Sequence, residues 1–281
     1  MTKQLKDLPA DIFALLDSKS HHTPSEENLE YLGEIVKTLM RTRLAERVEP
    51  TSPLRFSSLG KPNRQMWYEA HPIEGTKEEM SPQTYMKFLY GDLIEALLLF
   101  LAKEAGHTVE MEQAEVEVDG VKGHIDAIID GVVVDVKSAS PFGYQKFKTD
   151  SVLQDDPFGY VAQLSGYASV LTPGQGAAWL ANDKVGGDIC ISPLAPVVIA
   201  HHDPAERIAE LKEVIAQPEP PELCHQPVPD GKSGNMKLPT PCSYCAHKFR
   251  CHPEVRTFIY STGPRFLTTV ARVPDVYEVP R

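Results

Sequence analysis

The 281-residue sequence lacks a long apolar run. Its best candidate for a membrane helix, Ala96–Ala102, has seven residues, whereas a transmembrane helix needs about 20. The N-terminal residues, Met1–Asp7, lead into no apolar region of the kind that a signal peptide contains. We therefore expect an intracellular, cytoplasmic protein with no membrane partner.

Cysteine is also scarce, since the chain has only five. Four of them lie within the last 58 residues, namely Cys224, Cys242, Cys245 and Cys251. In a reducing compartment such a cluster indicates metal ligands rather than disulfides. Cys190 lies in an expected strand and is interpreted as a packing residue.

Positive charge is in deficit, with 28 basic against 39 acidic residues and a net charge of -11. The deficit is uneven, because His225–Arg281 holds 8 basic and 4 acidic residues. A basic C-terminal region beside an acidic body is compatible with a polyanionic partner.

Two helices are expected in the first part of the chain. Thr23, Pro24 and Glu26 have the pattern of an N-cap, a first-turn proline and a capping box, and apolar residues then recur at helical spacing toward Pro50. We interpret residues 1–50 as a helical packing segment. Apolar residues also recur at helical spacing over residues 82–105, which predicts a long, mostly buried helix with Gly106 as its C-cap.

Strands are expected after this helix. The dipeptides Asp119-Gly120 and Asp130-Gly131 are tight-hairpin signals. They predict an antiparallel meander of residues 109–118, 121–129 and 132–138. A loop, a helix over 160–171 and strands over 177–182 and 189–199 follow, so the order is that of a mixed α/β unit over residues 51–217. A proline-rich linker at 218–221 then opens a C-terminal segment, 218–281, with little periodicity.

Two carboxylates and a lysine are expected to meet on these strands. Asp135 and Lys137 project from the same face of a strand that is otherwise valine, because alternate residues share a face. The turn at Asp130-Gly131 brings Asp126 back toward Asp135. Carboxylate oxygens are the ligands that Mg²⁺ takes, and a bound metal makes water nucleophilic and neutralises phosphate charge. The simpler alternative is an edge strand with solvent-facing charges.

The segment Gly123-x-x-Asp126, followed after a hairpin by Asp135-x-Lys137, resembles the defining motif of the PD-(D/E)XK nucleases. That resemblance implies a restriction-endonuclease-like α/β core with a central mixed β-sheet flanked by helices. It also implies Mg²⁺ or Mn²⁺, held by Glu95, Asp126, Asp135 and the carbonyl of Val136, with Lys137 assisting the attacking water. Gly91-x-x-x-Glu95 and Gln163-x-x-x-Tyr167 resemble two further motifs of RecB-like exonucleases, which makes Gln163 and Tyr167 candidates for orienting Lys137 or contacting DNA.

The cysteine pattern resembles that of RecB-like nucleases with a C-terminal 4Fe-4S cluster. Ser57–Tyr68 resembles an N-terminal element that carries a distant cysteine ligand in that group, but Pro62 stands at its position here. We expect Cys224 to join Cys242, Cys245 and Cys251 instead, and the same set also suits a structural Zn²⁺. The further alternatives for the fourth ligand are His225, His247 and His252.

The expected partner is DNA, as single strands or ends. Tyr144–Lys148 is predicted to be a loop in which aromatic residues stack on bases while Lys146 and Lys148 bind phosphates. Further phosphate candidates are Arg64, Arg250 and Arg265. The tail from Phe258 resembles bacteriophage exonucleases, which implies a role in recombination or replication. A structure-specific endonuclease, a non-catalytic DNA-binding module and a zinc-stabilised interaction protein are the alternatives.

Overall fold

The computed structural model describes residues 3–17, 19–45 and 52–280, and the chain forms two compact units. Unit 1 comprises residues 1–60 and 81–208, and unit 2 comprises residues 61–80 and 209–281. Residues 61–80, which the sequence analysis included in the α/β core, therefore belong with the C-terminal segment. No helix in the described ranges is long and apolar enough to cross a membrane.

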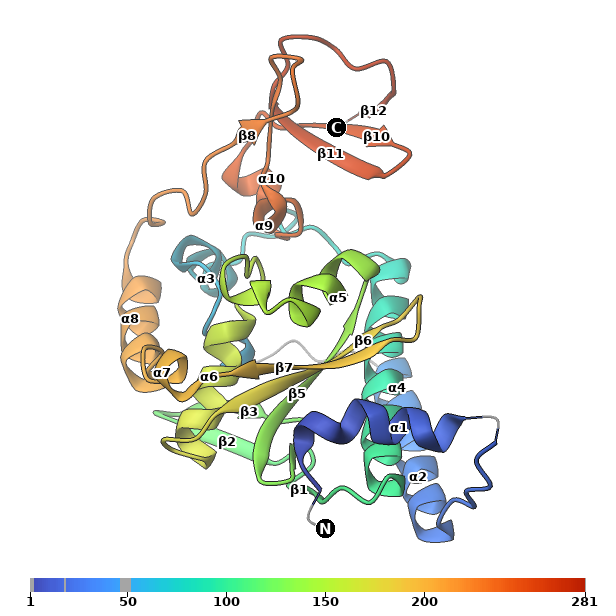
Figure 1. Ribbon diagram of the computed structural model, residues 1–281. Helices are drawn as coiled ribbons and strands as arrows, with labels where there is room; N and C mark the ends of the chain where they lie inside the picture. Colours follow the sequence, from blue (N-terminus) through green and yellow to red (C-terminus); the bar gives the residue numbers. More distant parts are fainter. Residues whose placement is uncertain (1–2, 18, 46–51, 281) are drawn as a thin grey trace. The chain divides into compact units, whose positions relative to one another are not determined.

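Unit 1 is built on a five-stranded mixed sheet (Figure 1). Its strands, in spatial order, are β1 (Val109–Glu110), β4 (Ala127–Ile129), β5 (Val132–Ala139), β6 (Ala177–Asp183) and β7 (Ile189–Leu194). Only β5 and β6 are parallel, and the other neighbours are antiparallel. The expected mixed α/β core with a central mixed sheet flanked by helices is confirmed.

Helices pack on this sheet, and its two faces differ in chemistry. Val134 and Val136 belong to a core shared with α1 (Leu8–Leu16) and α4 (Pro82–Glu104). The alternate residues of β5 project from the opposite face. There, Phe147 of α5 (Pro141–Lys148) contacts both Trp179 of β6 and Tyr160, the first residue of α6 (Tyr160–Leu171). Asp135 and Lys137 therefore lie among the side chains of the α5 and α6 face.

Both hairpin turns form where the sequence predicts them. The φ angles are +49° at Asp119 and +80° at Gly120, and +51° at Asp130 and +82° at Gly131. Positive φ at both central residues is what a two-residue hairpin turn of type I′ requires. The first turn joins β2 (Glu115–Val118) to β3 (Val121–His124), and the second joins β4 to β5.

The expected three-stranded meander was wrong, because its first two strands are interrupted. Met111 and Gln113 have positive φ angles of +52° and +54°, so the chain turns between β1 and β2. The second strand breaks at Ile125 and Asp126, between β3 and β4. As a result, β2 and β3 form a separate two-stranded sheet.

Other boundaries also differ from those expected. Helix α2 (Glu26–Leu44) is capped by Ser25, which accepts a hydrogen bond from Asn28 N, rather than by Thr23. Helix α4 has the expected extent, but Met86, Phe88 and Tyr90 in its first half are exposed. The last strand ends at Leu194, because Pro196 begins the short helix α7 (Pro196–Ile199). Single-turn helices cover Leu5–Asp7, Phe56–Ser58 and Ser151–Leu153.

Helix α2 packs on α4. The buried carboxylate of Glu104, on α4, binds the first turn of α2. The Glu104 side chain is 3% exposed and accepts hydrogen bonds from His22 Nε2 at 2.6 Å, Asn28 Nδ2 at 2.6 Å and Ser25 N at 3.1 Å. Burial acts to raise the pKa of Glu104, but the hydrogen bonds together outweigh it and the pKa is lowered. The ionised carboxylate is therefore favoured in the folded state.

Acid is expected to weaken this attachment. Because the folded pKa of Glu104 lies below its ordinary value of 4.5, its contribution to stability is present above that pH and is lost as the pH falls through the folded pKa. Urea unfolding from pH 7 to pH 3 should show Glu104→Gln less stable than wild type at pH 7, with the two converging in acid. A gap that is constant with pH would contradict this account.

Unit 2 contains a second five-stranded sheet. Its strands, in spatial order, are β12 (Tyr277–Val279), β10 (Arg256–Tyr260), β11 (Gly263–Thr269), β9 (Met236–Lys237) and β8 (Val228–Pro229). Unit 2 also contains α3 (Asn63–Ala70), α9 (Thr240–Ser243), α10 (Lys248–Cys251) and, from Ala209 on, the rest of α8 (Pro204–Ala216), which begins in unit 1. The sequence analysis expected little regular structure here and did not predict this sheet.

Candidate active site

The register of the β4–β5 hairpin brings the two aspartates together. Ala127 pairs with Val134, so the next position along the hairpin sets Asp126 opposite Asp135. The backbone pairing of β4 with β5 ends at Ala127. The next contact with β5 is made by the side chain of Asp126. Its Oδ2 accepts a hydrogen bond from the backbone N–H of Val136 at 2.6 Å. The break in the expected second strand thus places Asp126 against the middle of β5.

Lys137 is held between a carboxylate and an aromatic ring. Its Nζ lies 2.5 Å from Asp135 Oδ2 and 4.8 Å from the ring centroid of Tyr160. Burial acts to lower the pKa of Lys137, but the charges of Asp135 and Asp126 outweigh it and raise that pKa above its ordinary value. These carboxylates therefore favour the ammonium form of Lys137. The sequence analysis did not identify Tyr160 as its partner.

Glu95 of α4 contributes a third carboxylate. Its Oε1 accepts a hydrogen bond from Gln113 Nε2 at 2.6 Å. Burial and the charges of Asp135 and Asp92 raise the pKa of Glu95 to about 7. The pKa of Asp126 is also raised, by burial and by the charges of Asp135 and Glu95. Three carboxylates thus share a region where their negative charges repel one another.

The carboxylates of Glu95, Asp126 and Asp135 suit a divalent cation, but their oxygens do not converge on one point. Within residues 3–17, 19–45 and 52–280, no three His, Cys, Asp or Glu side chains are grouped closely enough to hold a metal ion as they stand. Asp135 Oδ2 is buried and makes no hydrogen bond, although it contacts the Lys137 ammonium. A hard cation prefers such oxygen ligands and would offset the repulsion that raises the pKa of Glu95. Asp126, Asp135 and Glu95 therefore fit the expected cation in charge and in chemistry.

Gln163 and Tyr167 lie one turn apart on α6, as their spacing predicts, and hydrogen-bond to each other. Tyr167 is 3% exposed and its ring stacks on Phe56 at a centroid distance of 5.0 Å. Burial and the charges of Asp135 and Asp126 raise its pKa to about 12, against the effect of the Gln163 hydrogen bond. Tyr167 is therefore a buried neighbour of the carboxylates, whereas Gln163 is partly buried. That the pair orients Lys137 or contacts DNA stays a prediction.

The four cysteines near the C-terminus lie in unit 2, and three of them affect the pKa of the fourth. Burial, together with the charges of Cys245, Cys251 and Cys224, raises the pKa of the Cys242 thiol to about 12. All five cysteines are free of disulfides. Cys190 interacts with Tyr144 in unit 1 and is separate from the group. The four-cysteine metal site stays a prediction, with Cys224 among the neighbours as expected.

Histidine nitrogens beside these cysteines are buried without hydrogen-bond partners. They are Nε2 of His225, Nε2 of His252 and both ring nitrogens of His247. His247 Nε2 lies 3.3 Å from Glu69 Oε1, which is an ion-pair distance without hydrogen-bond geometry. His225, His247 and His252, the alternative metal ligands expected from the sequence, thus each have a ring nitrogen that makes no hydrogen bond.

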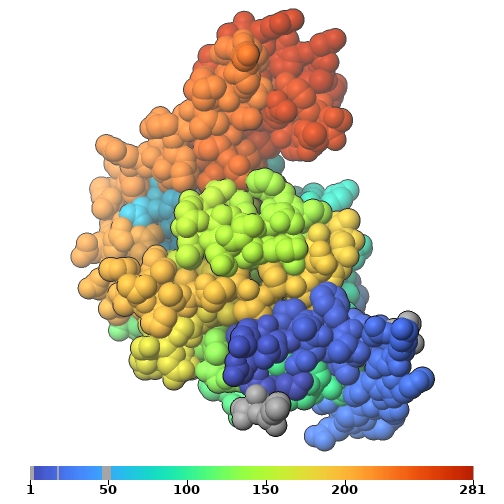
Figure 2. All heavy atoms as spheres, viewed as in Figure 1, coloured from blue at the N-terminus to red at the C-terminus, as the bar shows by residue number. Residues whose placement is uncertain are grey.

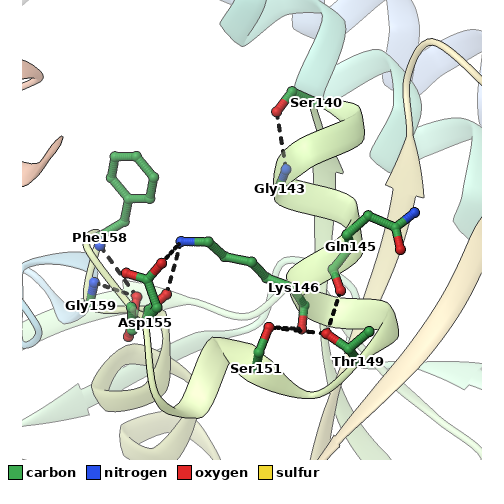
Figure 3. Close-up of polar contacts among 10 residues, drawn as sticks. Ser140, Gly143, Gln145, Lys146, Thr149, Ser151, Asp155, Phe158 and Gly159 are labelled. Carbon is green, nitrogen blue, oxygen red and sulfur yellow. Dashed lines mark hydrogen bonds and ion pairs between the residues drawn. The ribbon is translucent and has the colours of Figure 1, made fainter. Parts of the chain in front are cut away.

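The basic residues expected to bind phosphate already have contacts within the protein. Arg64 donates to Pro221 O, Arg250 Nη1 to His71 O at 2.6 Å, and Arg265 Nη1 to Asp230 Oδ1 at 2.9 Å. Lys146 Nζ lies 2.5 Å from Asp155 Oδ2 (Figure 3). Lys148 is exposed. Their binding to DNA stays a prediction, and Lys148 is the one whose charge is most accessible.

The segment Tyr144–Lys148 is not the expected loop. Ser140 Oγ accepts a hydrogen bond from Gly143 N and so caps α5 directly after β5. Tyr144 and Phe147 are 2% and 4% exposed, so their rings fill the core and cannot stack on bases. Helical spacing turns these two aromatics inward, and the accessible ring of α5 is that of Phe142, at 76% exposed. Figure 2 shows the yellow-green segment that contains α5 at the surface of unit 1.

No family model matches the sequence, and no curated protein shows significant similarity to it. Among solved structures, the chain is similar to that of SSO0001, with 18% identity, a TM-score of 0.44, and coverage of 79% of this chain and 95% of that one. It is also similar to an alkaline exonuclease (LHK-Exo) from Laribacter hongkongensis, with 13% identity, a TM-score of 0.34, and coverage of 64% and 94%. Both similarities are weak, and they assign no role to any residue here.

Proposed function

We propose that this protein is a metal-dependent DNA nuclease that hydrolyses phosphodiester bonds, acting as an exonuclease in recombination or replication. One observation carries the proposal: the β4–β5 hairpin sets Asp126 opposite Asp135 beside a partly buried lysine, and α4 adds Glu95. Two or three carboxylates with one ammonium are the groups needed to bind Mg²⁺ or Mn²⁺ and to stabilise charge at a phosphate.

Each residue has a distinct role in this proposal. Glu95, Asp126 and Asp135 would hold the cation, with the carbonyl of Val136 completing the set. When bound, the cation makes a water molecule nucleophilic and neutralises charge on the phosphate. Lys137 Nζ lies 2.5 Å from Asp135 Oδ2, so its ammonium would stabilise charge electrostatically and orient the water. The ring of Tyr160 contacts the ammonium and helps to fix its position.

Cleavage of end-labelled linear single- and double-stranded DNA tests the proposal. With Mg²⁺ or Mn²⁺, we expect wild-type activity that falls by about 10²- to 10³-fold in Lys137→Met and is abolished in Asp135→Asn. Lys122→Met is the control, because Lys122 is an exposed lysine that pairs with Glu115 on the β2–β3 hairpin. The order in which labelled products appear gives the polarity.

Other results of this assay would lead elsewhere. Activity in all four proteins, or DNA binding without cleavage in the wild type, would overturn the assigned site, and the latter would favour a non-catalytic DNA-binding module. Cleavage of covalently closed circular DNA would replace the exonuclease assignment with an endonuclease. Binding is best measured at low salt, because phosphate contacts weaken steeply as salt rises.

We also propose that Cys224, Cys242, Cys245 and Cys251 bind a structural metal centre, a 4Fe-4S cluster or a Zn²⁺. Burial and mutual proximity raise the pKa of the Cys242 thiol to about 12, and a bound metal ion would reverse that effect by favouring the thiolate. The four thiols form no disulfide, and Cys242 lies within electrostatic range of the other three. The role of the centre would be to hold unit 2 together.

Anaerobic purification followed by metal analysis tests this second proposal. We expect about one zinc ion or one four-iron cluster per chain, with brown colour in the latter case, and a large loss of thermal stability when a chelator removes it. Cys242→Ser should lose the metal, whereas Cys190→Ser in unit 1 should keep it. A metal-free, colourless wild type that is equally stable with and without chelator would refute the centre.

A further inference from the structure

Aromatic rings lead outward from the lysine of the candidate active site. The ring of Tyr160 lies 4.8 Å from Lys137 Nζ, and the ring of Phe158 lies 5.5 Å from that of Tyr160, centroid to centroid. The two neighbours differ in exposure, because Phe158 is 45% exposed while Tyr160 is partly buried. A half-exposed aromatic side chain thus lies two contacts from the ammonium, through the ring of Tyr160.

The loop that carries Phe158 is fixed in place by its own contacts. Asp156 accepts hydrogen bonds from the backbone N–H groups of Phe158 at 3.3 Å, Gly159 at 2.9 Å and Val161 at 2.8 Å. Lys146 binds the carboxylate and carbonyl of the preceding residue, Asp155. Figure 3 shows the Phe158 ring extending from the loop, away from these polar contacts. The exposed ring is therefore presented by a rigid backbone.

A second fixed point lies directly after Phe158. The backbones of Gly159 and Gly60 touch so closely that a Cβ on Gly159 would lie 2.4 Å from Gly60 Cα. Gly159 also has a φ of +77° and is the N-cap of α6, which begins with Tyr160. The contact between the backbones of Gly159 and Gly60 therefore fixes both Phe158 and Tyr160, whose ring contacts Lys137.

We infer that Phe158 is a base-stacking residue that binds the nucleotide next to the phosphate held at Lys137. Every base has an aromatic face, so a rigid, exposed ring beside a phosphate site suits an unpaired nucleotide of any sequence. The inference rests on the proposed nuclease function and narrows it, because the substrate at the site is then single-stranded DNA or a frayed end. Phe158 replaces the buried Tyr144 and Phe147 as the stacking partner.

Binding of short oligonucleotides tests this inference independently of cleavage. Fluorescence anisotropy at low salt in EDTA compares labelled oligothymidylate with an abasic strand of the same length. We expect Phe158→Leu to weaken oligothymidylate binding about tenfold, since one stacked base contributes on that scale, and to leave abasic binding unchanged. Phe158→Tyr should retain wild-type affinity. Phe13→Leu is the matched control, because Phe13 is 42% exposed on α1.

The outcomes separate the inference from the proposed function. Equal affinities of wild type and Phe158→Leu for oligothymidylate, or no binding by the wild type, overturn stacking at Phe158, whatever the cleavage assay shows. Selective weakening in Phe158→Leu supports it even if Mg²⁺ elicits no cleavage, in which case the nuclease assignment alone fails. An equal loss with the abasic strand would also overturn it, because that loss would reflect a phosphate contact.

Discussion

Lys137→Met is expected to destabilise the protein by about 3 kcal/mol or more, whereas Asp135→Asn is expected to change stability by less than about 1 kcal/mol. Removing one partner of a buried ion pair leaves the other charge uncompensated, at a typical loss of 3–5 kcal/mol. In Lys137→Met the uncompensated charge is Asp135, which is 5% exposed. Asp126 and Glu95 add to the repulsion that it meets.

Asp135→Asn has the opposite electrostatic consequence. The ammonium of Lys137 keeps Asp126 as a neighbouring anion, and the repulsion that raises the pKa of Glu95 is reduced. Both variants are expected to lose most or all activity but only Lys137→Met to lose much stability, so stability and activity separate at this pair. Urea unfolding at pH 7 measures the difference. Equal losses of stability would show that the three carboxylates do not repel one another in the folded protein.

Gly159→Ala is expected to destabilise unit 1 by more than about 4 kcal/mol, whereas Gly174→Ala should cost only about 1–2 kcal/mol. Both glycines have positive φ, +77° and +79°, so both alanines incur the left-handed penalty of about 1–2 kcal/mol. Gly174 has open space around the position of a Cβ, but a Cβ on Gly159 meets the backbone of Gly60 at 2.4 Å. Backbone atoms cannot turn aside as a side chain can, so the loop must move.

Thermal unfolding of the two alanine variants measures this contrast, and Gly60→Ala provides a reciprocal check. A Cβ on Gly60 would lie 2.3 Å from Gly159 Cα, so we expect a similar loss of stability. Comparable, small losses for Gly159→Ala and Gly174→Ala would mean that the two segments separate easily. That result would also weaken the argument that Phe158 is rigidly presented.

Local signals predicted the centre of the site well. Asp130-Gly131 specifies a two-residue turn, and alternation along a strand then fixes which side chains meet, so the approach of Asp126 to Asp135 followed from short-range rules. Helix 160–171 was also predicted at its observed limits, because apolar spacing and a flanking glycine agree there. Where turn chemistry and periodicity point the same way, the sequence is sufficient.

Tertiary contacts decided the features that the sequence did not reveal. Residues 144–148 mix aromatic and basic side chains, as a base-stacking loop does. The packing of Phe147 against Trp179 became visible only in the fold, where the segment is a helix and the rings of Tyr144 and Phe147 are buried. Three strands of unit 2, β8, β9 and β12, are only two or three residues long, too short to show a period. Tyr160 and Gln113 became visible as neighbours of Lys137 and Glu95 only once the chain was folded.

The end of β4 at Ala127 limits which residues can replace Asp126. Because backbone pairing stops at Ala127, the amide of Val136 depends on the Asp126 carboxylate for its hydrogen bond. One oxygen of Asp126 thus accepts a backbone hydrogen bond, on the carboxylate that is also the proposed metal ligand. Loss of the side chain would leave a buried amide unsatisfied, so a descendant that abandoned catalysis would still be under selection to keep an acceptor here. Asparagine, rather than alanine, is the replacement that such a lineage would tolerate.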